Sequence, residues 1–104
     1  MAGMVVIYKQ PADVEAFEKH YFETHIPLAK KIPGLRKYEV SRGPITVVAG
    51  PPDVFLIGTL HFDDLDAMRQ AFASPEGRAA AADRQNYAPD ESGVQMFLFD
   101  SQDV

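Results

Sequence analysis

Four short stretches of the chain are rich in β-branched and aromatic residues, which is typical of strands. In the first, third and last of them hydrophobic residues occupy neighbouring positions, so both faces of these three strands are apolar. The long connection 43–53 has two glycines and three prolines and is expected to be irregular, with at most a short extended piece at 45–48. The predicted strands are residues 4–9, 35–42, 54–62 and 93–99.

A helical spacing of hydrophobic residues separates the first two predicted strands. Pro11 and Asp13 suit the start of a helix. Pro27 lacks the amide hydrogen that a regular helix needs, so we expect a kink or break near Ile26. A turn at Pro33-Gly34 then leads into the second strand. The hydrophobic face of this helix consists of Val14, Phe17, Tyr21, His25 and Leu28.

A second helical region follows the third predicted strand. Asp63 or Asp64 is placed to cap its start. Ser74 and Pro75 have the residue types of an N-cap and a first helical position, so we expect the helix to restart there and to end at Asn86. The hydrophobic positions of its first part are Leu65, Met68 and Phe72.

The predicted element order is β-α-β-β-α-β, which is the ferredoxin-like α+β sandwich with an antiparallel four-stranded sheet. We expect a single domain over residues 1–104, with its core at about 4–99. Two helices cover only one face of such a sheet, and at roughly 25 cal/mol per Å² an exposed second apolar face would cost several kcal/mol. An identical sheet from a second copy would cover it, so we expect a homodimer. The alternative is that these are isolated exposed apolar residues.

Composition narrows the possible partners. The formal net charge is −5, and the longest basic run is the pair Lys30-Lys31, so we expect no nucleic acid partner. No apolar run approaches the roughly 18 residues of a membrane span, and the first ten residues do not resemble a signal peptide. The chain has no cysteine, which rules out disulfides and thiolate chemistry and fits a cytoplasmic location.

Four stretches, in order, resemble one known family. They are "FEKHYFETHIPLAKKIPGLRKYEV", with its His-x-Pro-Leu pattern, "GTLHFDDLDAMRQAF", "SPEGRAAAADRQNY" and the closing strand. Together they run from about residue 4 to residue 99. The chain resembles the EthD-like proteins (ethyl tert-butyl ether degradation protein EthD) of the dimeric α/β-barrel superfamily. The resemblance implies the same fold and the same dimer as the pattern analysis.

The resemblance also implies a kind of chemistry. The namesake belongs to a bacterial system that degrades ethyl tert-butyl ether, and relatives include a methylmuconolactone methylisomerase and fungal proteins that dehydrate or decarboxylate polyketide intermediates. They share cofactor-free acid–base chemistry on small apolar or aromatic compounds. In the isomerase a histidine and a tyrosine of this spacing line the pocket, and they match His25 and Tyr38. That enzyme's pocket cysteines have no counterpart here. We expect neither a cofactor nor a metal ion.

His25 and Tyr38 are therefore the expected catalytic residues. An imidazole gives and takes protons near neutral pH, and a phenol can hydrogen-bond a substrate carbonyl. The alternatives are a helix-terminal histidine bonded to a carbonyl and a tyrosine that only packs. Tyr8, Phe22 and His61 are the expected substrate-binding residues; for His61 the alternative is a hydrogen bond near the sheet edge.

Three functions are compatible with this pattern. The first is a cofactor-independent lyase, cyclase or isomerase acting on a small aromatic or lactone-like compound in a dimeric barrel, in a catabolic or polyketide-type pathway. The second is a non-catalytic carrier or scavenger of a small hydrophobic molecule. The third is a monooxygenase-like member of the superfamily. In the first, His25 would be the acid–base group and Tyr38 its hydrogen-bonding partner.

Overall fold

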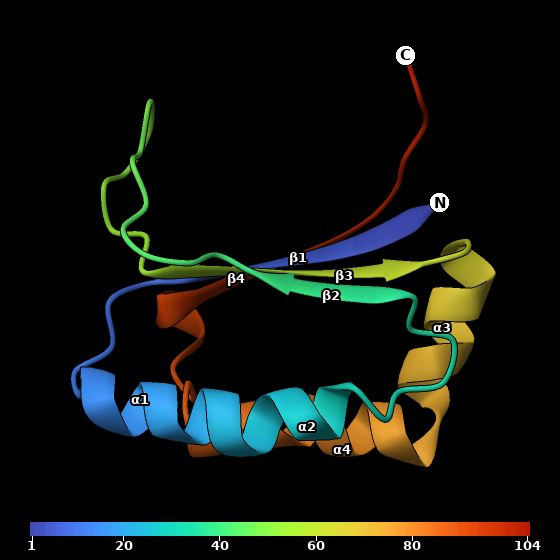
Figure 1. The fold of residues 1–104 in the computed structure, drawn as a ribbon, viewed down its shortest axis with the longest axis horizontal. Coiled ribbons are helices and arrows are strands. Elements are labelled where there is room, and N and C mark those ends of the chain that lie inside the picture. The colour runs from blue at the N-terminus through green and yellow to red at the C-terminus, as the bar shows by residue number, and fades with distance from the viewer.

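The structure, a computed structural model that describes all 104 residues, is a four-stranded antiparallel sheet with helices packed on one face (Figure 1). The element order confirms the predicted β-α-β-β-α-β arrangement. The strand order in the sheet is β2-β3-β1-β4, so the first and third strands are central. The strands are β1 (Ala2–Tyr8), β2 (Lys37–Val40), β3 (Leu56–Phe62) and β4 (Val94–Asp100).

The helices begin where the sequence predicts. The carboxylates of Asp13 and Asp64 accept hydrogen bonds from backbone amides three residues on, and the Ser74 hydroxyl accepts one from Gly77. Asp63, the other candidate cap, instead pairs with Arg36. The helices are α1 (Val14–His20), α2 (Ile26–Ala29), α3 (Leu65–Ala73) and α4 (Pro75–Asp83), with a π-helical segment at Tyr21–His25 and 3-10 turns at Arg84–Asn86 and Glu91–Gly93.

The expected break near Ile26 is absent. The backbone stays helical from α1 through the π segment into α2, and the Ile26 amide donates to the Tyr21 carbonyl, five residues back. Pro27 has no amide hydrogen and lies in the first turn of α2, directly after this wider turn. At that position the helix tolerates the missing backbone hydrogen bond. His25 therefore lies within a continuous helical rod instead of at a helix end.

Strand boundaries shift by a few residues from those expected. β1 begins at Ala2, and β2 is confined to four residues, although the Arg36 and Ser41 amides extend its pairing with carbonyls of β3. The stretch 45–48 forms no strand.

The face of the sheet toward the helices carries the core. Alternate residues of the two central strands are buried there, in register with one another: Tyr8 lies opposite Leu56 and Ala2 opposite Phe62. Phe17 and Tyr21 pack on this face from the helical layer. A second cluster, further along the sheet, joins Phe62 and Met68.

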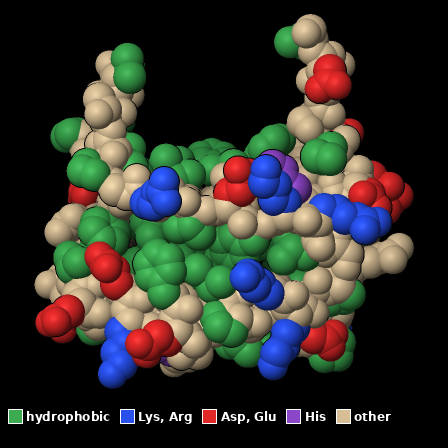
Figure 2. Space-filling view, in the orientation of Figure 1, with side chains coloured by type: hydrophobic (Ala, Val, Ile, Leu, Met, Phe, Trp, Pro, Cys, Tyr) green, Lys and Arg blue, Asp and Glu red, His purple; other side chains and the backbone are tan.

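The other face of the sheet is open and apolar. Val5 and Ile7 are half-buried there, and Phe97 and Phe99 of the edge strand are 45% and 40% exposed. The Phe99 ring covers Gly3, where a Cβ would lie 2.9 Å from it. The 43–53 connection and the C-terminal tail project from this side of the sheet, with hydrophobic side chains between them (Figures 1 and 2). None of the helices is long and apolar enough to cross a membrane.

Candidate functional site

A cavity of about 510 Å³ lies between the helix-facing side of the sheet and the helical layer. Of its 17 lining residues, 14 are hydrophobic. Strands β1, β2, β3 and β4 form its floor, and the helices cover part of it from the other side. It is open to solvent beside β4, where the lining residues Met96 and Leu98 are exposed. Two of the lining side chains carry a charge or titrate near neutrality, His25 and Arg84. The cavity therefore suits a small, largely apolar compound that meets a few polar groups.

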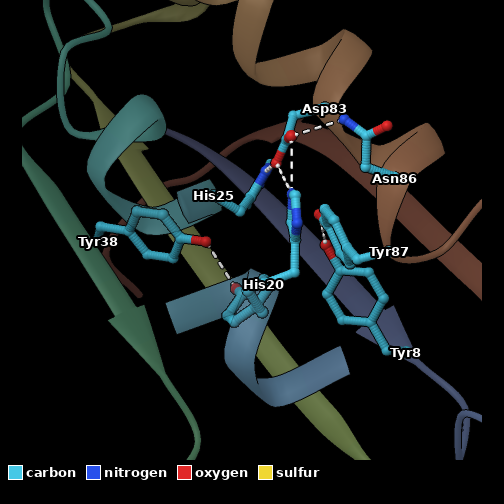
Figure 3. Close-up of polar contacts among 8 residues, drawn as sticks. Tyr8, His20, His25, Tyr38, Asp83, Asn86 and Tyr87 are labelled. Carbon is cyan, nitrogen blue, oxygen red and sulfur yellow. Dashed lines mark hydrogen bonds and ion pairs between the residues drawn. The ribbon is translucent and has the colours of Figure 1, made fainter. Parts of the chain in front are cut away.

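His25 reaches this cavity from the π-helical segment and is held by a carboxylate. Its Nδ1 lies 3.0 Å from Oδ2 of Asp83, the last residue of α4 (Figure 3). Its Nε2 has no hydrogen-bond partner, and because no fully buried side-chain nitrogen or oxygen lacks one, Nε2 is accessible to solvent. The side chain that carries it lines the cavity. An Nδ1–H that donates to Asp83 leaves the Nε2 lone pair free to accept a proton.

Asp83 is buried and fully occupied by donors. Besides His25, its carboxylate lies 2.9 and 3.0 Å from Nε2 of His20, and it accepts a hydrogen bond of 3.0 Å from the Asn86 amide. Burial opposes the charge of Asp83, but the hydrogen bonds from Asn86 and the two imidazoles outweigh it and lower the pKa of the carboxyl. Asp83 is therefore a fixed anion that joins α4 to the π segment.

The balance at His25 favours the neutral imidazole. Burial lowers its pKa below the usual value near 6.5, and the neighbouring His20 adds to this, while the hydrogen bond and charge of Asp83 act in the opposite direction. At pH 7 the ring is therefore neutral and can act as a base through Nε2.

Two pairs of tyrosine hydroxyls flank the imidazole. Tyr21 and Tyr38 are joined by a hydrogen bond of 2.6 Å, and Tyr8 and Tyr87 by one of 2.8 Å. The His25 ring packs between the pairs, 5.4 Å from the Tyr21 ring and 4.7 Å from the Tyr87 ring, centroid to centroid. All four tyrosines line the cavity.

The phenols stay protonated. Burial raises the pKa of Tyr8 to about 12 and raises those of Tyr21, Tyr38 and Tyr87 as well. They can therefore donate hydrogen bonds at any physiological pH but do not act as bases.

Gly58 makes room for one of these pairs. It lies on β3 opposite Val40 and Val6, and a Cβ added there would be 3.0 Å from the Tyr21 hydroxyl oxygen. A side chain at this position would displace the Tyr21–Tyr38 pair or fill the cavity floor.

The structure brings together three of the five expected site residues. Tyr8, His25 and Tyr38 line the cavity. Phe22 does not, because it lies on the outer side of the helical rod and is 47% exposed. His61 is on the open face of the sheet, where its Nε2 lies 2.9 Å from a carboxylate oxygen of Glu39. Neither residue lines this cavity, and the role of Phe22 and His61 in substrate binding stays a prediction.

The cavity lies on the helix side of the sheet, within one chain. The pocket expected inside a dimeric barrel would need a second copy of the chain and stays a prediction. The sequence analysis missed Tyr21, Asp83, Arg84 and Tyr87 as site residues. Three of these belong to the segment Asp-Arg-Gln-Asn-Tyr at the end of α4, whose run of polar and aromatic residues after four alanines was the available signal.

Comparisons with known proteins agree with this architecture. The family model of the EthD domain matches residues 9–91. An uncharacterized 11.0 kDa protein from the thcB-thcC intergenic region of Rhodococcus erythropolis is 36% identical over 104 residues, covering 100% of this chain and 98% of that protein.

Solved structures show the same fold. An ethyl tert-butyl ether degradation (EthD) family protein from Bacillus halodurans is 32% identical, with a TM-score of 0.86 over 98% of this chain and 99% of that one. A dimeric ferredoxin-like protein of unknown function from Thermobifida fusca is 19% identical, with a TM-score of 0.65 over 94% of this chain and 88% of that one. The chain belongs to the EthD family.

Proposed function

We propose that this protein binds a small, largely apolar compound in the cavity and moves a proton on it without a cofactor, as a lyase, cyclase or isomerase would. His25 is the acid–base group. The observation that carries the proposal is the hydrogen bond of 3.0 Å between His25 Nδ1 and buried Asp83, combined with an unpaired, accessible Nε2 on a residue that lines the cavity. Asp83 acts through His25 and is a positioning residue.

The polar groups around His25 support this chemistry. A neutral imidazole next to the bound compound can remove a proton, and Asp83 stabilises the imidazolium that forms. Tyr38 acts beside Tyr21 as a hydrogen-bond donor to an oxygen on which charge develops. The largely apolar walls lower the local dielectric constant, which strengthens these interactions.

A carrier function is the second candidate. A lining with 14 hydrophobic residues of 17 can hold an apolar molecule without any reaction. A carrier function does not depend on the orientation of the His25 ring, whereas the proposed catalysis does. This dependence distinguishes the two functions.

We further propose that the protein acts as a homodimer through the open face of the sheet. The exposed aromatic rings of β4 and the two segments that project beside the sheet would enclose an identical sheet (Figure 1). The dimeric ferredoxin-like protein of Thermobifida fusca supports this arrangement. Since the cavity is on the other face, each copy would keep a site of its own.

The test separates turnover from binding. A panel of small aromatic and lactone compounds is assayed for both with the wild type, His25→Gln and, as a control, His61→Gln, whose histidine lies on the opposite face of the sheet. The proposal predicts that His25→Gln binds the compound without turning it over, and that His61→Gln both binds it and turns it over. If several compounds bind wild type and His25→Gln equally and none is turned over, the carrier function is correct.

A further inference from the structure

Arg84 is the single cationic side chain among the residues that line the cavity, apart from His25 when protonated. It follows α4 directly and is half-buried. Its Nη1 donates a hydrogen bond of 2.8 Å to the backbone carbonyl of Ala88. A guanidinium has five N–H donors, so most of its donors have no protein acceptor.

The guanidinium has no anionic partner. Arg84 takes part in none of the ion pairs of the protein. The carboxylate next to it in sequence, Asp83, is occupied by two imidazoles and an amide. The guanidinium is therefore free to pair with an anionic ligand that enters the cavity.

The neighbouring phenol pair adds a neutral donor. Tyr8 and Tyr87 share one hydrogen bond but have two O–H groups, and neither hydroxyl has another protein partner. One O–H proton of the pair is therefore free for a ligand. Arg84 is a neighbour of this pair, because its carbonyl oxygen accepts a hydrogen bond of 3.2 Å from the Tyr87 amide.

We propose that the cavity takes an organic acid with an apolar body, whose anionic oxygen is bound by Arg84 and by the free O–H of the Tyr8–Tyr87 pair. This rests on the proposed function, because it names the class of compound bound in the same cavity. The Tyr87 ring lies 4.7 Å from the His25 ring, centroid to centroid. A carboxylate held by Arg84 and the Tyr8–Tyr87 pair would place the adjoining carbon atoms beside His25.

Binding calorimetry with a matched pair of probes tests this. The probes are 1-naphthoate and 1-naphthamide, which have the same apolar body and differ in charge. Wild type is expected to bind naphthoate about tenfold or more tightly than naphthamide, as charge-assisted hydrogen bonds imply. Arg84→Met is expected to lose this preference and keep its affinity for naphthamide, while Arg84→Lys keeps part of the preference.

Arg78→Met is the matched control, since Arg78 is an exposed arginine of α4 outside the cavity lining. It should retain the preference for naphthoate. Equal binding of both probes to wild type, or an unchanged preference in Arg84→Met, overturns this inference and leaves the proposed function standing. If wild type binds neither probe nor any other compound with an apolar body, the proposed function fails as well.

Discussion

His25 and Asp83 are 58 positions apart in the sequence, and Nδ1 of the histidine lies 3.0 Å from Oδ2 of the aspartate. The side chain of the histidine is 12% exposed and that of the aspartate 7%. The pair joins the first helical rod to the end of α4 and points one ring nitrogen at the carboxylate (Figure 3). This fixes both the tautomer and the orientation of the imidazole.

The first prediction concerns the pKa of His25. Burial lowers it, and Asp83 counteracts this shift. In an NMR titration of the imidazole resonances, we expect His25 to titrate below pH 6.5 in the wild type and at a still lower pH in Asp83→Asn, which removes the carboxylate charge. A midpoint above 6.5 in the wild type, or an upward shift in Asp83→Asn, contradicts this account.

The second prediction is a pH dependence of stability. Since the folded-state pKa of His25 is below its usual value of 6.5, the unfolded chain takes up the proton first as the pH falls. The free energy of unfolding should therefore decrease as the pH falls from about 6.5 through the folded-state pKa, and above 6.5 this contribution is constant. Urea unfolding at a series of pH values measures how the free energy of unfolding changes with pH. In His25→Gln this change should be smaller below pH 6.5. If it is the same as in the wild type, the pH dependence comes from other groups.

The third prediction concerns the contact between α3 and α4. A Cβ at Gly77 would clash with the Ala71 carbonyl oxygen and lie 2.7 Å from Phe72 Cα, both backbone atoms. Gly77→Ala should therefore destabilise the protein by at least about 1–3 kcal/mol, despite the better helix propensity of alanine. Gly93→Ala, where a Cβ meets nothing within 4 Å, is the control and should change stability by less than about 0.5 kcal/mol. If Gly77→Ala changes stability in thermal unfolding as little as Gly93→Ala does, α3 and α4 can move apart at little cost in free energy.

The fourth prediction concerns the open face of the sheet. Light scattering after size exclusion should give twice the chain mass of 11.5 kDa, that is 23 kDa. Phe97→Glu places a charge within the proposed interface and should yield the 11.5 kDa species. Phe22→Glu is the control, because Phe22 is equally exposed but lies on the helical layer. A wild-type mass of 11.5 kDa rules out the dimer.

Most of the fold could be predicted from local patterns. The caps at Asp13 and Ser74 depend on residue types within one helical turn, so the sequence displays them directly. Pro27 misled the analysis because its effect depends on whether the turn before it widens, and the π segment supplies that wider turn. The apolar character of both sheet faces is visible in the sequence, but which face carries the cavity depends on where the helices pack.

The site was predicted only in part, for a physical reason. His25 and Tyr38 stand in the stretch that carries the family resemblance. Asp83 and Tyr87 join them only through tertiary packing, since α4 runs beside the first helical rod (Figure 1). Helix spacing gives no hint that Asp83 is buried, because an aspartate at a helix end is usually solvated.

The most direct test of the central claim, that His25 is a base held toward the cavity, is proton exchange on a bound carbon acid. 2-Tetralone, a small apolar ketone with acidic C–H groups, is incubated in D₂O with the wild type, His25→Gln, Asp83→Asn and His61→Gln, and loss of its α-proton NMR signal is followed. We predict faster exchange than in buffer for the wild type and His61→Gln, buffer-level exchange for His25→Gln, and a reduced rate for Asp83→Asn. Exchange in the wild type no faster than in buffer although the ketone binds, or equally fast exchange in His25→Gln, would contradict it.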